Sequence, residues 1–451
     1  MAKKINSIVN LTSLLILCLV VFCLFSGCGN VSSEVTTSIT LLHFNDLGGN
    51  VTPLEDDSAG LARIATLIKE EKNRNPACLL LVSGDLITGS ALSSLTKGEA
   101  IFRLANLLGI DAFTPGNHEF DYGVPQYMKF MKIADFPFLT ANMEYEGRVF
   151  GDAPFVIFTV GGEARVGVIG LISKDTPWLT FKENTIGVVF STPAEIANKF
   201  LPNMESQSHL IVALTHQGLE DDKKLALTAK GIDVIVGGHS HDYLFKPVRV
   251  ENTWIVQAGE EGRYVGIVRI RIEKKSEKIL NFHSELKKID SNISEDADVS
   301  ESVQSEERMS PVNINEPLGE VTKFMAKNKD VARWVAKALK DYAKADLGMV
   351  NIGGIRADLQ PGPITLAHIF RVMPFDNYLV VVEIRGEMII KWLGENKIVL
   401  DRRIKIKKNE IYKVATMDFV AGIFRLSNPK NTGVLVQDVL VEDLKTRKKL
   451  P

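Results

Sequence analysis

The stretch that decides the fold is GNHEFDYG, residues Gly116–Gly123, which follows the short apolar run DAFT. An amide, an imidazole and two carboxylates stand between glycines at the end of what reads as a strand. Other apolar runs end in the same way, in an aspartate or a histidine close to glycine: Asp46, Asp85, His216, and the pair His239 and His241. A lone histidine after a strand is most often an ordinary loop residue. Repeated polar strand ends in one domain are improbable by chance, so we expect these side chains to share one site.

Strand-like and helix-like segments alternate through the first part of the chain. Continuous apolar runs, typical of strands buried on both faces, are ITLLHF, CLLLVS, HLIVALTH and DVIVGG. Between them, GLARIATLIKEEK and EAIFRLANLLG carry apolar residues at helical spacing. The alternation predicts a layered α/β domain over residues 38–288. Loops at the carboxyl ends of strands form the binding crevice of such sheets, so the polar strand ends are expected there.

The residue types at these strand ends point to metal-assisted hydrolysis. Cleaving a phosphate ester at neutral pH needs a water converted to hydroxide and a leaving oxygen that is neutralised. Two metal ions about 3.5–4 Å apart achieve both by clamping the attacking and leaving oxygens. Imidazole and carboxylate ligands suit zinc or manganese. The sequence therefore predicts a hydrolase site with two divalent ions.

The motifs GNHEFDYG, SGD, LTHQG and GGHSH resemble the metallophosphoesterase signature, and NIGGIR and PFDN extend the likeness to the C-terminal region. From about Ser38 to its end, the chain resembles the bacterial and animal 5′-nucleotidase family, which includes periplasmic UDP-sugar hydrolases and cyclic-nucleotide phosphodiesterases. The resemblance implies a four-layered α/β/β/α metallophosphoesterase domain, an acidic linker over residues 289–317 and a smaller α+β substrate domain over residues 318–451. It also implies hydrolysis of nucleotides or related phosphate esters.

The resemblance assigns a role to each polar strand end. Asp85 bridges both ions, Asn117, His216 and His239 complete one site, and Asp46 and His241 belong to the other. His118 is implied to lie near the transferred phosphoryl group, as a general acid or a charge stabiliser. Asp121, three residues on, orients it, and we expect this carboxylate to raise the pKa of His118.

The chain departs from the family at its first motif. The family has Asp-x-His, whereas this sequence has Asp46 followed two residues later by Gly48. The site of Asp46, Asp85 and His241 then keeps three protein ligands, which with water is a normal catalytic zinc shell. We therefore expect an ion to bind there with an affinity lowered by a factor of about 10–100.

We expect a second water above Gly48, where the family has an imidazole. His43 lies within a strand and is expected in the core. Asn50 is a less favoured substitute ligand. If weaker metal binding is the only defect, Gly48→His is expected to raise activity.

The C-terminal region offers substrate contacts. NIGGIRADL reads as a strand and a glycine-rich turn with Arg356 at its tip, and an arginine fork pairs with phosphate oxygens. Asn351 offers an amide to a sugar or base, and the resemblance implies that Phe375 and Phe419 sandwich the base. Judged singly, each phenylalanine could equally be a core residue. The alternative role of Asn351 and Arg356 is to stabilise the glycine-rich turn. Two polar contacts of the family are missing: a Gly-Gly-Asp-Gly turn after Phe419, and an arginine where Met325 stands.

The N-terminus reads as an export signal. MAKKINSIVN supplies a basic start, and the apolar run after it ends in SGC at Cys28. This layout predicts a lipoprotein signal peptide over residues 1–27, lipid on Cys28 and a spacer over residues 28–37. An uncleaved membrane anchor is the alternative. Either way we expect an exported protein held at the cell envelope, in the periplasm or on the outer membrane face.

Composition sets the remaining expectations. The chain has 451 residues with a formal net charge of -2, which suggests two domains and does not favour a nucleic acid polymer as partner. We expect a monomer acting on a small molecule. Beyond Cys28, Cys78 is alone, so no disulfide framework is expected. Seven acids and no Lys or Arg between Asp290 and Glu307 predict a solvated linker or exposed helix. The alternative function is a degenerate member that binds nucleotide-like ligands with little turnover.

Overall fold

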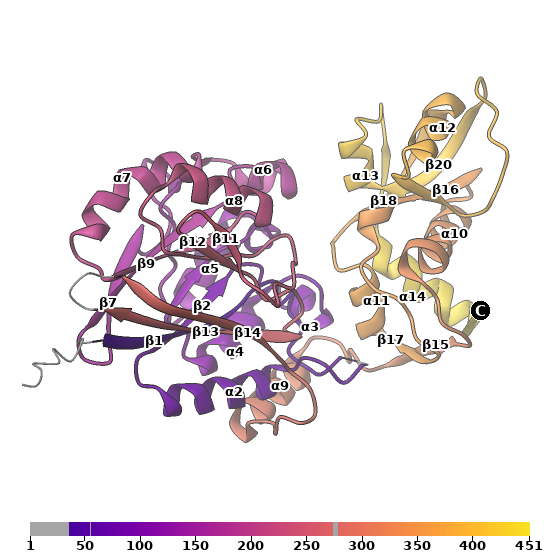
Figure 1. The fold of residues 1–451 in the computed structure, drawn as a ribbon. Coiled ribbons are helices and arrows are strands. Elements are labelled where there is room, and N and C mark those ends of the chain that lie inside the picture. The colour runs from indigo at the N-terminus through magenta and orange to yellow at the C-terminus, as the bar shows by residue number, and fades with distance from the viewer. Residues whose placement is uncertain (1–35, 55, 274–277) are drawn as a thin grey trace, which may run out of the picture.

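The computed structural model describes residues 36–54, 56–273 and 278–451, which form two lobes (Figure 1). The predicted signal peptide and the lipidation site at Cys28 lie outside the described residues. Within those three ranges, no helix combines the length and the apolar character that crossing a membrane requires.

The first domain is built on two sheets. One has the strand order β14-β13-β1-β2-β3 and the other β11-β12-β10-β9-β7-β6. The strands of the first sheet are β1 Thr36–Phe44, β2 Cys78–Ser83, β3 Ala112–Thr114, β13 Tyr264–Glu273 and β14 Ile279–Lys288. Those of the second are β6 Phe155–Val160, β7 Ala164–Ile172, β9 Leu210–His216, β10 Val234–Val236, β11 Val248–Val250 and β12 Thr253–Val256. Strands β1, β2 and β3 run parallel, as do β7, β9, β10 and β12, so their loops leave at common edges.

The two sheets pack face to face, with helices on both outer sides. Strand β1 shows why its sequence is apolar throughout: Ile39 and Leu41 lie in the core between the sheets, whereas Leu42 and Phe44 lie under the outer helices. The helices over the first sheet are α2 Leu61–Arg74, α4 Glu99–Ala105 and α5 Gly123–Ile133. Those over the second are α7 Pro193–Glu205 and α8 Leu219–Thr228. The predicted α/β/β/α order of layers is confirmed.

Shorter elements complete the first domain. They are the strands β4 Met143–Tyr145, β5 Arg148–Val149 and β8 Val188–Phe190, which form a small sheet of their own, and the helices α3 Ala91–Leu95 and α6 Thr176–Leu179. Single helical turns are η1 Asn106–Leu108, η2 His118–Phe120 and η3 Lys182–Thr185.

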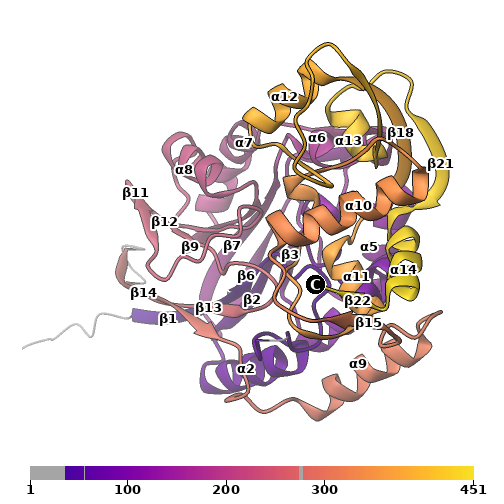
Figure 2. The ribbon, with the colours of Figure 1, turned by 90° about the vertical axis from the view of Figure 1, so that its right-hand side faces the viewer.

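The acidic segment forms helix α9, Ala297–Met309, on the surface of the first domain. The Asp296 side chain caps its N-terminus by accepting a hydrogen bond from the Val299 amide (3.2 Å). Val299 and Val303, four residues apart, are buried in the core that also holds α2 and α4. Glu306 accepts two hydrogen bonds from Arg103, at 2.7 and 2.8 Å. Helix α9 is therefore attached to the first domain, and Figure 2 shows it beside α2.

The second domain has a separate core and an α+β arrangement, as predicted. Its main sheet has the order β19-β16-β20-β18-β21, and a smaller one the order β17-β15-β22. The strands are β15 Pro317–Val321, β16 Leu347–Asn351, β17 Gly362–Thr365, β18 Tyr378–Arg385, β19 Ile398–Leu400, β20 Ile411–Met417, β21 Lys430–Leu435 and β22 Lys449–Leu450. The helices are η4 Lys327–Val331, α10 Ala332–Ala343, η5 Ile352–Gly354, α11 Leu366–Val372, α12 Gly386–Gly394, α13 Asp418–Ile423 and α14 Val436–Arg447.

The two domains touch where α3 meets α11. Ala91, Ile314 and Phe370 form a small buried apolar cluster there. Next to it, the Ser94 hydroxyl donates a hydrogen bond to the Pro374 carbonyl (3.1 Å). This contact places the loop after α11 against the strand ends of the first domain.

Candidate active site

Two aspartates leave the first sheet side by side. Strands β1 and β2 pair in parallel, with Phe44 opposite Val82, so the loops carrying Asp46 and Asp85 emerge at the same edge. The Asp46 amide donates to the Gly84 carbonyl (3.0 Å), which ties the two loops together. The structure therefore brings both carboxylates to one place at the carboxyl end of the sheet.

The backbone at these positions is strained in the same way. Asp46, Asp85, His239 and His241 all have positive φ, at 51°, 52°, 79° and 58°. A left-handed conformation costs a residue other than glycine about 1–2 kcal/mol. Such strain persists where the surrounding structure enforces it, and it concentrates at functional sites. Four strained polar residues in one cluster therefore mark this edge as a site.

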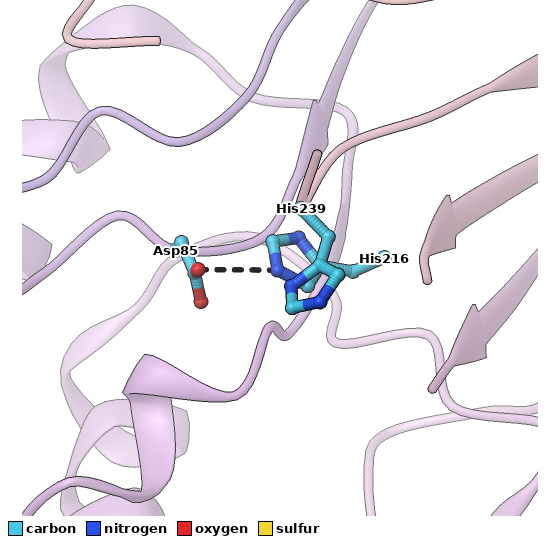
Figure 3. Close-up of side chains that lie close together, drawn as sticks. All are labelled: Asp85, His216 and His239. Carbon is cyan, nitrogen blue, oxygen red and sulfur yellow. Dashed lines mark ion pairs between the residues drawn. The ribbon is translucent and has the colours of Figure 1, made fainter. Parts of the chain in front are cut away.

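Asp85, His216 and His239 form the tightest group. Their potential ligand atoms lie within 4.8 Å of one another, and Figure 3 shows both imidazoles beside the Asp85 carboxylate. His216 Nε2 is 3.1 Å from Asp85 Oδ2, and its Nδ1 is 2.8 Å from the Ser83 carbonyl. Because a carbonyl only accepts, Nδ1 carries the hydrogen and Nε2 is directed at the site. The charges of Asp85 and Asp46 outweigh the lowering effect of burial and raise the pKa of His216 to about 10.

The group has unsatisfied buried atoms that suit a cation. Asn117 Oδ1 is buried and accepts no hydrogen bond from a described residue. The buried Asp46 Oδ1 and His216 Nε2 have only their ion-pair contacts, to His241 Nε2 (3.2 Å) and Asp85 Oδ2 (3.1 Å) respectively. A buried acceptor without a donor normally destabilises a protein by about 1–3 kcal/mol. Divalent cations bound by oxygen and imidazole nitrogen would satisfy all three. Gly116 makes room for them, since a Cβ there would lie 2.1 Å from Asp85 Oδ1 and 2.7 Å from His216 Nε2. The residues present therefore fit divalent metal ions.

Asp46 and His241 form a second group next to the first. His241 Nε2 is 3.2 Å from Asp46 Oδ1, and its Nδ1 is 2.7 Å from Glu260 Oε2. Asp46 Oδ2 already accepts hydrogen bonds from the Asn45 side chain (2.6 Å) and the His239 amide (2.9 Å). Only Oδ1 of Asp46 thus remains for a cation.

Gly48 lies beside this second group and adds no ligand. It has φ +59°, and a Cβ there would lie 3.1 Å from the Thr88 carbonyl and 3.2 Å from Asn50 Nδ2. Asn50 Nδ2 donates to the Leu47 carbonyl (3.1 Å), so the Asn50 side chain folds back on its own loop. His43 is fully buried within β1, where burial lowers its pKa to about 3. It is a core residue, as expected.

His118 begins η2 and faces both Asp85 and Asp121. Its Nδ1 donates to Asp121 Oδ2 (2.8 Å), its Nε2 is 3.9 Å from Asp85 Oδ2, and its amide donates to Asp85 Oδ1 (2.9 Å). Burial alone lowers the pKa of His118, but the charges of Asp121 and Asp85 outweigh it and raise the pKa to about 9. Metal-free, the imidazole therefore carries a positive charge at neutral pH.

The sequence interpretation missed several supporting residues. The fully buried Glu119 carboxylate accepts hydrogen bonds from the amides of Asp85 (3.0 Å), Leu86 (2.9 Å) and Gly116 (2.6 Å). It thereby joins the loop after β2 to the loop after β3. Its place inside GNHEFDYG was the signal that could have found it. Glu260, by contrast, stands outside every motif.

The substrate residues predicted in the second domain lie against the metal ligands. A cavity of about 300 Å³ is lined by Asn351, Arg356, Phe375 and Phe419 together with Asp85, Asn117, His118, His239 and His241. The Phe375 ring is 5.9 Å from the His118 ring and 6.0 Å from the Arg356 guanidinium. Phe419 packs edge to face on Phe181 at 5.8 Å. Both phenylalanines therefore face the cavity and not the core.

A larger cavity of about 1310 Å³ continues past the second group. Asp46, Gly48, His241, Glu260 and Arg356 line it, and so does Lys327. Met325 is buried in the core of the second domain and offers nothing to the cavity. Lys327, two residues further on, lines this cavity, and no motif of the sequence had singled it out.

Comparison with known proteins matches each domain separately. Residues 39–243 match the calcineurin-like phosphoesterase family, and residues 314–404 match the 5′-nucleotidase C-terminal domain. Protein UshA of Yersinia enterocolitica is 29% identical over 463 residues, covering 89% of this chain and 82% of that protein. The 5′-nucleotidase of Vibrio vulnificus is 28% identical over 425 residues, covering 80% of this chain and 76% of that protein.

Solved structures share the two-domain arrangement. A 5′-nucleotidase precursor from Thermus thermophilus has a TM-score of 0.82 at 25% identity and covers 92% of this chain and 97% of its own. The sulfate thiohydrolase SoxB of the same organism has a TM-score of 0.78 at 20% identity, covering 91% of this chain and 94% of that chain. The second likeness shows the fold alone. Since proteins with differently named activities share this fold, the substrate must be argued from the site.

Proposed function

Because this chain belongs to the family in which a calcineurin-like metallophosphoesterase domain precedes a 5′-nucleotidase C-terminal domain, we propose that it hydrolyses phosphate esters of nucleotides or closely related compounds. The chain is a metallophosphoesterase, and the substrate class and the number of ions are the points proposed. The observation that carries the proposal is the shared cavity, which joins Arg356 and Phe375 to the ligand cluster at Asp85.

Two divalent ions fit the residues present. Asp85, Asn117, His216 and His239 would hold one ion, and Asp46, Asp85 and His241 the other. When bound, such ions lower the pKa of a water and neutralise charge on phosphoryl oxygens. Zinc and manganese both suit this mixture of imidazole and oxygen ligands.

The other residues bind the substrate and hold a proton. The Nδ1 hydrogen of His118 is fixed on Asp121, so the Nε2 hydrogen is the one available to a leaving oxygen. The Arg356 fork pairs with phosphate oxygens, and Asn351 offers its amide to the sugar or base. Phe375 and Phe419 offer ring faces to the base, and stacking accepts any base.

The test is hydrolysis by the purified protein with manganese or zinc, using AMP, UDP-glucose and a chromogenic phosphate ester as substrates. We expect turnover that falls about 10²–10⁴-fold in His118→Ala, as for loss of a general acid. Wild-type turnover no greater than that of His118→Ala would overturn the proposal.

A degenerate protein that binds nucleotide-like ligands without turnover is the second candidate. Gly48 at a ligand position and the missing aspartate turn after Phe419 favour it. It predicts one bound ion or none per chain, with nucleotide binding retained. Metal analysis of the purified protein separates the two candidates, because the hydrolase requires two ions.

We also propose that the protein is exported, lipid-anchored through Cys28 and monomeric. Support comes from the basic start, the apolar run and the SGC ending of the N-terminal segment. Cys28→Ala is expected to abolish lipid incorporation and cleavage of the signal, which intact mass measures. An intact mass of Cys28→Ala that differs from that of the wild type only by the substituted side chain would favour the uncleaved anchor.

A further inference from the structure

We propose that Glu260 is a positioning residue that orients His241 toward a metal ion, and that it supports the site where Gly48 replaces a ligand. The inference rests on the proposed function and deepens it, since it concerns the same site. No motif of the sequence includes Glu260, and only the structure places it there.

The geometry around His241 carries the first step. Nδ1 of His241 is 2.7 Å from Glu260 Oε2, and Nε2 is 3.2 Å from Asp46 Oδ1. Since an ionised carboxylate only accepts, the hydrogen on Nδ1 points at Glu260. In the neutral ring this leaves the lone pair on Nε2, which faces the carboxylates of the site. A carboxylate behind a ligating imidazole fixes both its tautomer and its orientation.

Glu260 is itself held in place from both sides. The turn between β12 and β13 is tied to the loop after β1 by Asn45, which donates to the Gly259 carbonyl (2.6 Å) and accepts from the Ala258 amide (2.9 Å). On the other side, the Glu261 amide donates to the Asp46 carbonyl (2.7 Å). The turn that carries Glu260 is thus fixed to the residue whose carboxylate His241 faces.

The neighbouring site shows the same arrangement with a different acceptor. There, the Ser83 carbonyl fixes His216 from behind at 2.8 Å and directs Nε2 toward Asp85. His216 is also fully buried, so packing holds its ring. The His241 side chain is 29% exposed, and the residue lines the open cavity of about 1310 Å³. Its orientation therefore depends more on a single hydrogen bond than that of His216 does.

The absence of a ligand at Gly48 makes this orientation matter. The site of Asp46, Asp85 and His241 has three protein ligands, so His241 is its only imidazole. Losing the support of one ligand among three should cost this site more affinity than it would cost a site with four. Glu260 Oε2, 2.7 Å from His241 Nδ1, also adds negative charge beside a site that has lost a ligand.

The test compares Glu260→Ala and Glu260→Gln with the matched control Glu261→Gln. The Glu261 side chain pairs with Arg263 (2.9 Å), and its backbone contact with Asp46 survives the substitution. Isothermal titration calorimetry with Mn²⁺ and with Zn²⁺ measures both sites in the purified protein. We expect the weaker site to lose about 10–100-fold in affinity in Glu260→Ala and less in Glu260→Gln. The stronger site and Glu261→Gln should keep wild-type affinity.

A second readout does not depend on affinity or turnover. Long-range ¹H–¹⁵N NMR of the zinc-loaded protein reports which ring nitrogen of His241 carries the hydrogen. We expect Nδ1–H in the wild type and a mixture of tautomers in Glu260→Ala, with circular dichroism unchanged. Unchanged affinity at both sites in Glu260→Ala would overturn the inference alone. A wild-type protein that binds no divalent ion would overturn the proposed function together with it.

Discussion

The Asp121 carboxylate accepts hydrogen bonds through both oxygens, and its Oδ1 accepts one from the Thr180 hydroxyl (3.4 Å). Its Oδ2 accepts from His118 Nδ1 (2.8 Å) and from the Thr88 hydroxyl (2.7 Å). Thr88 holds the carboxylate in place, and the carboxylate holds the imidazole. A proton on His118 Nε2 is therefore presented in a fixed direction, which a freely rotating histidine could not provide.

The His118–Asp121 pair predicts the pH at which activity falls on the alkaline side of the pH profile, here called the alkaline limb. The raised pKa of about 9 keeps His118 charged at lower pH, so the donor function is present below that pKa and is lost as the pH rises through it. Cations bound beside Asp85 counteract the effect of the carboxylates on the pKa of His118, because their charge is positive. The alkaline fall in activity is therefore expected at or below this pH. Asp121→Asn removes a charge that raises the pKa and should move the limb of kcat/KM to lower pH. The exposed Asp175→Asn is the control, and a limb that stays in place in Asp121→Asn would contradict this role.

Gly48 predicts a stability cost for restoring the missing ligand. With φ +59°, any side chain at this position costs about 1–2 kcal/mol in the free energy of unfolding, in Gly48→Ala as in Gly48→His. The new Cβ would also lie 3.1 Å from the Thr88 carbonyl and 3.2 Å from Asn50 Nδ2, and of these two contacts only the one with the Asn50 side chain can be removed by substitution. We therefore expect metal affinity to rise clearly above that of Gly48→Ala only when Gly48→His is combined with Asn50→Ala. Calorimetric titration measures the metal affinity of each variant. An equal gain in affinity in Gly48→His alone would show that Asn50 does not obstruct the site.

At the scale of elements, the loops after β2 and β3 act as one unit because the Glu119 carboxylate joins them, in addition to the hydrogen bond from the His118 amide to Asp85 Oδ1. Glu119 reaches from η2 to the amides of Asp85, Leu86 and Gly116. The distance between Asp85 and Asn117 therefore depends on a residue that touches no substrate. A substitution at Glu119 is therefore expected to affect the positions of both loops.

Glu119→Gln is expected to destabilise the site and the fold together. Its amide nitrogen cannot accept, so at least one backbone N–H is left unpaired in a fully buried position. We expect the free energy of unfolding of the metal-free protein to fall by about 1–3 kcal/mol in denaturant titrations. Metal affinity should fall with it. The exposed Glu144→Gln is the control, and equal stability of the two variants would show that Glu119 is dispensable.

The elements that the sequence predicted well are those with a local signal. Continuous apolar runs became β1, β2, β9 and β10, and the polar residues after them meet at one edge because the strands are parallel. Glu119 and Glu260 escaped prediction because their partners lie far along the chain and no periodicity records a hydrogen bond. The fold of Asn50 onto its own loop escaped too, although its partner Leu47 is only three residues away, because no sequence pattern records that hydrogen bond. Of the two structures the sequence allowed for the acidic segment, the structure shows a helix, α9, whose apolar face is only Val299 and Val303.

At the scale of the whole molecule, the site is divided between two cores. The first domain supplies the ligands of the ions, and the second supplies Arg356 and Phe375, which the contact at Ser94 brings within reach. Sequence motifs indicated both halves but not how they face each other, since that depends on packing between surfaces. Substitutions in the second domain should accordingly change substrate affinity, and substitutions of the ion ligands in the first domain should change the rate of hydrolysis.

Arg356→Ala is expected to weaken substrate binding without removing metal. Loss of charge-assisted hydrogen bonds to phosphate, about 1.5–3 kcal/mol, corresponds to a rise of roughly 10–100-fold in KM. Arg356→Lys keeps the charge but loses the fork, so it should recover only part of the loss. Phe419→Ala should raise KM for AMP but not for ribose 5-phosphate, which has no aromatic ring to stack. A uniform effect of Phe419→Ala on both substrates would contradict a stacking role.

Helix α9 has a further consequence for how the lobes relate. Its N-cap residue Asp296 pairs with Lys69 and its Glu306 pairs with Arg103, so the chain is attached to the first lobe up to the end of α9. The second lobe begins at Pro317. Only residues 310–316 span the join. Seven residues span at most about 25 Å when fully extended, so this segment limits how far the two lobes can separate. The proposed substrate would bridge the two lobes, because the ion ligands lie in the first lobe and Arg356, Phe375 and Phe419 lie in the second, and its hydrolysis would break that bridge.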